Sequence, residues 1–172
     1  MTPRAVPEVV EPPLAAGERE TLLAFLQRQR DLVLWKLDGL SDHDASRVGT
    51  GSGLTITGIV EHLVDVERSW LRRWFGGVRG LHIGGVDPQH VAEPRHLEGA
   101  RLRDLLAAYA QESRRCDELI RERSLDELEA GVGGGHSLRW ILHHLIEETS
   151  RHLGHLDLLC ELADGRTGDA PH

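Results

Sequence analysis

The sequence predicts an all-α protein whose helices form a four-helix bundle. Apolar residues recur at helical spacing in four long segments, 18–40, 55–75, 100–123 and 138–163. No segment shows the alternating pattern of a strand, and glycine-rich or polar loops separate the four. Amphipathic helices of similar length can bury their apolar faces against one another.

The first two predicted helices have clear limits. In 18–40, Leu22, Leu26 and Val33 recur at helical spacing, and Ser41 can cap the short turn that follows. The second helix, 55–75, follows a Ser-Gly pair and stops at two glycines. Its apolar stripe is made of Ile56, Ile59, Leu63, Val66, Trp70 and Trp74.

The last two helices follow the longest loop, 76–99, which is rich in Gly, Pro and His, a composition that suits a functional or mobile segment. After 100–123, a capping box at Ser124 predicts a short helical turn. Ser137 is the expected N-cap of the fourth helix, and Gly165 is its expected stop. The histidines of the long loop are expected to be solvated, with a lid role left open; they are His82, His90 and His96.

Length and charge limit the classes of function. The 172 residues fit one domain, and we expect it to span 17–168 behind a flexible arm, 1–16, in which 1–13 lack the apolar stretch of a secretory signal. A net charge of -8 argues against nucleic acid and anionic membranes as partners, and no apolar run approaches the length of a membrane span. Two cysteines, Cys116 and Cys160, are expected as reduced core thiols in a cytoplasmic protein.

The fourth helix places ionisable side chains on its apolar face. At about 100° per residue, the imidazoles of His144, His152 and His155 fall within about 80° of Glu148, as do several leucines that must be buried. A buried carboxylate without a partner is costly, and a divalent metal ion would neutralise it. Glu148 and His152, four residues apart, point to the same side of the helix.

A third ligand must come from a facing helix, and His62 in the second helix lies at the flank of its stripe. Two histidines and one carboxylate suit Zn²⁺, Ni²⁺ or Fe²⁺, and three protein ligands leave a position for water or substrate. Other interpretations stay open at this point. His62 can be a core histidine bonded to a carbonyl, Glu148 can pair with an arginine, and His144 or His155 can join the metal or orient a ligand.

Two segments resemble the DinB-like superfamily. Residues 54–63, Leu-Thr-Ile-Thr-Gly-Ile-Val-Glu-His-Leu, resemble its second helix, and residues 137–157 resemble its last helix. The start of the first predicted helix, 18–26, and the segment at its end, 35–42, are similar to an actinobacterial branch of that group. The resemblance extends over about 18–168.

The resemblance implies a four-helix bundle with a three-residue metal site at one end, and narrows the ligands to His62, Glu148 and His152. Many members carry a histidine where Glu148 stands. The His, Glu, His set is similar to the N-terminal domain of mycothiol-dependent maleylpyruvate isomerase, a zinc enzyme whose additional C-terminal domain we do not expect in this protein. Related transferases use mycothiol or bacillithiol. His155 stands where many members have Gln, and we expect it to support catalysis.

The first hypothesis is therefore a metal-dependent thiol S-transferase, with zinc as the expected cofactor and a low-molecular-weight thiol as cosubstrate. Its partners would be that thiol and a small electrophile, and His155 or His144 would steer a proton. A metal-dependent hydrolase with Glu147 as base is the second hypothesis. The third is a non-enzymatic, stress-related bundle that the metal holds together as a monomer or a homodimer.

Overall fold

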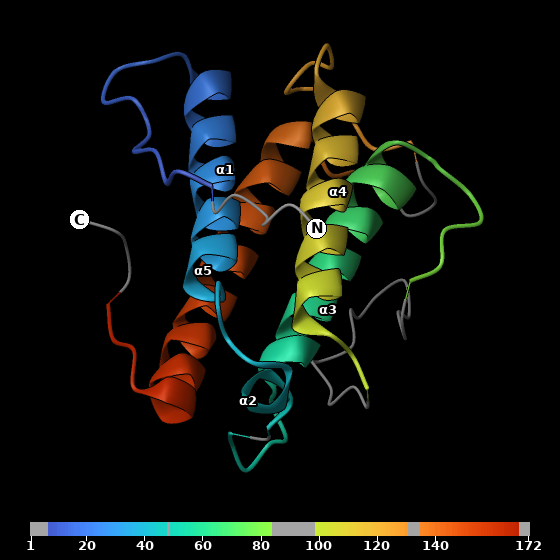
Figure 1. Ribbon diagram of the computed structural model, residues 1–172. Coiled ribbons are helices and arrows are strands. Elements are labelled where there is room, and N and C mark those ends of the chain that lie inside the picture. Colours follow the sequence, from blue (N-terminus) through green and yellow to red (C-terminus); the bar gives the residue numbers. More distant parts are fainter. Residues whose placement is uncertain (1–6, 48, 84–98, 131–134, 169–172) are drawn as a thin grey trace.

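The computed structural model describes residues 7–47, 49–83, 99–130 and 135–168 (Figure 1). Its elements within these ranges are helical, and the prediction of an all-α protein is confirmed. They are α1 (Glu18–Lys36), α2 (Asp42–Ser46), α3 (Ile56–Glu67), the π-helix η1 (Arg68–Phe75), α4 (Leu102–Ile120) and α5 (Leu138–Asp164). The DinB-like bundle type, with a metal site at one end, stays a prediction.

Side-chain caps define where the helices begin, largely as the sequence predicts. The hydroxyl of Ser41 accepts from the backbone N–H of Asp44 at 3.1 Å, and Ser137 accepts from Trp140 at 3.3 Å. Gly165 ends α5 with a φ of 79°, a left-handed conformation that glycine adopts without strain.

Three local expectations differ from the structure. The first helix ends at Lys36 instead of continuing to residue 40. The second changes at Arg68 from α-helix to π-helix, in which Gly76 donates to the carbonyl five residues back, that of Leu71, at 2.9 Å. The helical turn expected after Ser124 is a non-helical turn that leads to an isolated β-bridge between Leu128 and Ser137.

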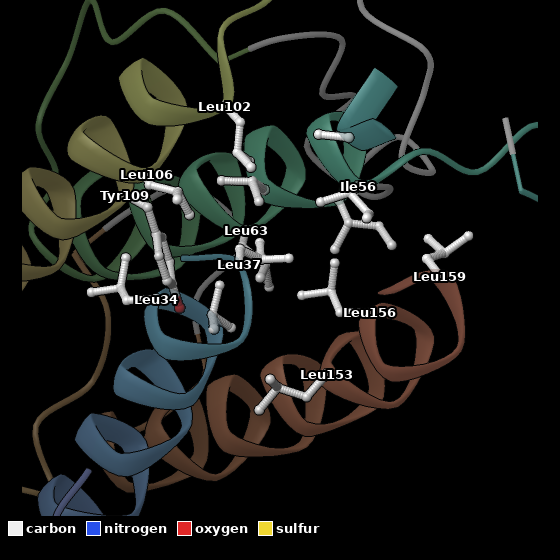
Figure 2. Close-up of a cluster of buried hydrophobic side chains, with 14 of the residues drawn as sticks. Leu34, Leu37, Ile56, Leu63, Leu102, Leu106, Tyr109, Leu153, Leu156 and Leu159 are labelled. Atoms are coloured by element: carbon white, nitrogen blue, oxygen red, sulfur yellow. The ribbon is translucent and has the colours of Figure 1, made fainter. Parts of the chain in front are cut away.

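The long helices pack in pairs, α1 against α5 and α3 against α4, and α3 also packs against α5 (Figure 1). Two apolar clusters fill the interior. The first contains Leu34, Leu63, Leu106 and Leu156, one from each long helix, which are among the side chains labelled in Figure 2. The second includes Val66, Phe75, Leu142 and Leu145, among other residues. The first cluster includes residues of α3 up to 64 and residues of α5 from 153 onwards. Along α3 the second cluster begins at residue 66, after those of the first, and within α5 it includes residues up to 145.

One ion pair joins the N-terminal arm to α1, and another joins α1 to α5. Glu11, in the described part of the N-terminal arm, pairs with Arg28 of α1 at 2.7 Å. Lys36, at the end of α1, pairs with Asp157 of α5 at 2.6 Å.

None of the described helices combines the length and apolarity that crossing a bilayer demands.

Candidate metal centre

The three predicted ligands lie together where α3 faces α5. One carboxylate oxygen of Glu148, Oε1, is 3.1 Å from Nε2 of His62 and 3.2 Å from Nε2 of His152. The three candidate ligand atoms all lie within 4.8 Å of one another. His62 reaches the site from α3 and the other two from successive turns of α5. The helical spacing and the pairing of the two helices thus produce one cluster, which we call the triad.

Packing on both sides holds the triad in place. His62 and His152 are buried, with exposed fractions of 7% and 4%, whereas Glu148 is half-buried. On α5, Glu148 and His152 fall between the two apolar clusters in chain order, whereas His62 lies among the α3 residues of the first cluster. The two imidazole rings meet edge to face, with centroids 4.6 Å apart. Their Nε2 atoms therefore converge on the Glu148 carboxylate. Because Glu148 is only half-buried, a further ligand can reach the carboxylate from its exposed side.

Electrostatics favour an anionic carboxylate at this position. Hydrogen bonds from His152 and then His62 hold the pKa of Glu148 well below its usual range, and they outweigh the effect of burial, which raises it. An ionised carboxylate between two imidazoles is a ligand set for a divalent cation. Ligands about 2.1 Å from a tetrahedral zinc ion lie about 3.4 Å from one another. The observed separations from Glu148 are close to that value, so the residues present fit such an ion.

His155 lies directly behind one ligand. Its Nδ1 is 3.4 Å from Nδ1 of His152, the ring nitrogen that does not face Glu148. When one of these nitrogens donates and the other accepts, the contact fixes the tautomer and the rotation of His152. The His155 side chain is half-buried, one turn further along α5. Its position suits a residue that orients a ligand and exchanges protons with solvent.

His144 lies apart from the triad. Its ring contacts Trp70 with centroids 4.7 Å apart and stacks on Trp140 at 5.2 Å with an interplanar angle of 15°. Burial lowers its pKa, although Glu148 and Glu147 act in the opposite direction. Among the described residues, the group that could hold a metal contains neither His144 nor His155.

The remaining expectations have mixed outcomes. Glu147, the base of the hydrolase hypothesis, is exposed. His82 is also exposed, and its backbone carbonyl accepts from Arg68 at 3.0 Å. His90 and His96 lie outside the described residues, as does most of the loop for which a lid role was left open.

Sequence reasoning missed the role of His136. Its Nδ1 is 3.1 Å from Glu129, and its ring packs 4.3 Å from that of Trp140. The tryptophans at 70, 74 and 140 assemble with it and with His144 into a group of five rings. The available signal was the spacing of four residues between Trp70 and Trp74 and between Trp140 and His144, which places each pair on one side of a helix.

Comparison with known proteins matches the model of the mycothiol S-transferase family to residues 21–165, which include the whole triad. The chain belongs to the mycothiol S-transferase family. Membership confirms the resemblance to DinB-like, mycothiol-related proteins. No curated protein matches the chain. A family of this kind implies a small thiol as partner, and the protein's own thiols cannot take that place. Cys116 and Cys160 are free and buried, and burial raises the pKa of both, which disfavours the nucleophilic thiolate.

Proposed function

We propose that this member of the mycothiol S-transferase family is a zinc-dependent transferase that joins mycothiol, or a similar low-molecular-weight thiol, to small electrophiles. The convergence of His62, Glu148 and His152 on one point carries the proposal, because such a site has room for an exogenous ligand. Family membership supplies the thiol. We further propose that the helices form a DinB-like four-helix bundle with the metal at one end, and that the protein acts in the cytoplasm in detoxification or the stress response.

The reaction would need a thiolate at neutral pH. A divalent metal bound at the triad would favour the thiolate form of the thiol there, because a coordinated thiol loses its proton. Sulfur then forms a bond to the electrophilic carbon, and the leaving group departs with the bonding electrons. The chain's task is to hold the two reactants together and to remove the thiol proton.

His155 is our candidate for the proton and for the orientation of His152. Its Nδ1 contacts Nδ1 of His152, and an imidazole can bind or release a proton at its ring nitrogens. Because the side chain is half-buried, that proton can pass to solvent. The arrangement gives the proton a route that does not require either ligand histidine to leave the site.

The proposal is tested by following thiol consumption with a panel of electrophiles, in purified protein with zinc and after removal of metal. We expect metal-dependent turnover with mycothiol in the wild type and its loss in His62→Ala and Glu148→Ala. The matched control is His143→Ala, since His143 is an exposed histidine of α5 whose ring bonds to the carbonyl of Arg139. Elemental analysis of the same samples should find metal in the wild type and in His143→Ala, and none in His62→Ala or Glu148→Ala.

Two results would contradict the proposal. Equal metal content in wild type, His62→Ala and Glu148→Ala would remove the triad as the site. Metal-dependent hydrolysis without any thiol requirement would replace the transferase with the hydrolase considered from the sequence.

A further inference from the structure

Five aromatic rings gather where η1 meets the first turns of α5, and we call them the ring cluster: Trp70, Trp74, His136, Trp140 and His144. Trp70 is its centre, with ring centroids 4.2 Å from Trp74, 4.7 Å from His144, 5.4 Å from Trp140 and 5.5 Å from His136. The sequence contains four tryptophans, and three of them are here. A protein with 4% aromatic residues has thus concentrated its largest rings in one place.

The ring cluster continues the line of the triad along α5. Trp140, His144, Glu148 and His152 follow one another at intervals of four residues, so each lies about 6 Å further along the helix axis than the last and about 40° further round it. On the facing side, Trp70 follows His62 by eight residues through α3 and η1. The contact between Trp70 and His144 shows that both rows meet. The ring cluster therefore begins about one helical turn from Glu148.

The π-helix contributes to this arrangement. Such turns are rare and occur frequently at functional sites, because they shift the direction of the side chains that follow. Here the change from α3 to η1 occurs at Arg68, two residues before Trp70. Trp70 then packs against Trp74 at an interplanar angle of 84° and also contacts Trp140 and His144 of α5. A deviation from regular helix thus coincides with the approach of the Trp70 indole to the triad's helix.

The ring cluster is accessible. Trp140 is 45% exposed, and Trp70, Trp74, His136 and His144 are partly exposed. Indole faces that remain open to solvent offer large, rigid surfaces for stacking by another flat ring. His144 adds to this surface as a neutral ring, since burial disfavours its charged form. Trp140 and His144 are stacked at 15°, while Trp70 meets Trp74 and His144 edge to face, so the largest exposed ring for stacking is that of Trp140.

We propose that the ring cluster is the binding subsite for the electrophile and selects planar aromatic or conjugated molecules. The electrophile would stack on Trp140 and the adjacent rings with its reactive carbon directed along α5 towards the triad. This inference rests on the proposed transferase function and specifies its second substrate. His144, one turn from Glu148, is the member of the ring cluster that lies nearest to the triad along α5.

The first test measures selectivity. Rates with mycothiol are compared for a nitro-substituted chlorobenzene, which is flat and aromatic, and for iodoacetamide, which is neither. We expect Trp140→Ala to lower the ratio of the two kcat/KM values roughly tenfold, because stacking is lost for the aryl substrate alone. Trp140→Phe, which keeps a ring, should retain most of the ratio. Leu158→Ala is the matched control, because Leu158 is a 63% exposed residue of the same helix outside the ring cluster.

The second test does not depend on turnover. Equilibrium dialysis with 2,4-dinitroaniline, a flat and unreactive analogue, should give saturable binding to wild type and Leu158→Ala, and roughly tenfold weaker binding to Trp140→Ala. A thermal melt of each variant verifies that it is folded.

The outcomes separate the two proposals. Absence of thiol transfer with every electrophile, together with Trp140-dependent binding of the analogue, would refute the transferase and support the subsite. Thiol transfer with an aryl preference and analogue binding that are both unchanged in Trp140→Ala would support the transferase and overturn the subsite.

Discussion

At the scale of single residues, neighbouring side chains set the charge of Glu148 and the orientation of His152. Glu148 is held as an anion by two imidazoles, and His152 is contacted from behind by His155. The sequence could predict the shared helix face of these residues, because it follows from spacing alone. It could not predict the tautomer or the order of contacts, because those depend on which ring nitrogen faces which partner.

The contact between His155 and His152 leads to a prediction about metal affinity. We expect His155→Leu to weaken metal binding by roughly 10–100-fold, the usual effect of removing the partner that orients a ligand histidine. Competition with a chromophoric chelator measures the affinity. His143→Leu, at an exposed position of the same helix, should bind metal like the wild type. An unchanged affinity in His155→Leu would show that His152 is oriented by packing alone.

The burial of His144 leads to a prediction about pH. Its folded-state pKa is lowered, so the folded protein resists a proton that the unfolded chain accepts near its ordinary pKa of about 6.5. Stability from this residue is therefore complete above about pH 6.5 and declines as the pH falls through the lowered folded-state pKa. In metal-free protein, the free energy of unfolding should decrease less between pH 7.5 and 5.5 in His144→Phe than in wild type. Parallel urea-denaturation results for the two proteins would contradict the prediction.

At the scale of elements, a buried ion pair fixes the start of η1. Arg30 of α1 donates two hydrogen bonds of 2.6 Å to Glu67, the last residue of α3, and the two side chains are 3% and 2% exposed. Burial alone would lower the pKa of Arg30, but Glu67 raises it and keeps the guanidinium charged. The pair anchors the helix at the residue before its geometry changes.

Breaking this pair should be costly. Arg30→Met leaves the Glu67 carboxylate buried without its cation, and we expect a loss of about 3–5 kcal/mol in the free energy of unfolding. Arg30→Met combined with Glu67→Leu should lose less than Arg30→Met alone, since the other carboxylate that Arg30 pairs with, Asp117, is 41% exposed and no deeply buried charge is left unpaired. Arg28→Ala is the control, because its partner Glu11 is 76% exposed and such pairs contribute about 1 kcal/mol or less. Urea denaturation distinguishes these cases.

A glycine within α5 offers a substitution that should raise the free energy of unfolding. Gly154 lies inside the helix with nothing within 4 Å of the position that a Cβ would occupy. Gly154→Ala should therefore raise the free energy of unfolding by about 0.5–1 kcal/mol, since alanine loses less conformational entropy in a helix. Gly165→Ala should lower it, because Gly165 has a φ of +79°. Thermal melts of both variants would show shifts of opposite sign, and equal shifts would refute the argument.

The sequence predicts the helices better than their irregularities. Apolar periodicity located all four long helices, because each must bury one face. It missed the π-helix, since the same stripe continues through Trp70 and Trp74 whichever hydrogen-bond pattern the backbone adopts. It also placed a helical turn after Ser124. There the serine hydroxyl does accept from Asp126 at 3.2 Å, but the chain then pairs with the residues before α5.

At the scale of the whole molecule, the triad connects two helices that the chain brings together from distant positions. A ligand that binds the folded state and not the unfolded state stabilises it by about 4 kcal/mol at a concentration one thousandfold above its Kd. We therefore expect a chelator to lower the Tm of the zinc-loaded protein. His143→Ala should show the same shift, whereas His62→Ala should show none. A Tm that does not respond to chelator in the wild type would contradict a metal bridge between α3 and α5.

The separation of the ligands along the chain has a consequence for folding. Glu148 and His152 are four residues apart, so a nascent helical turn can present both, but His62 lies 86 residues before Glu148. Recruiting His62 requires the closure of a long loop, and its entropic cost is met only when apolar faces pack. In the docked state, by contrast, the third imidazole is present at a high effective concentration. A metal ion held by all three residues is thus a reporter of completed tertiary structure, which a two-ligand complex on an isolated α5 is not.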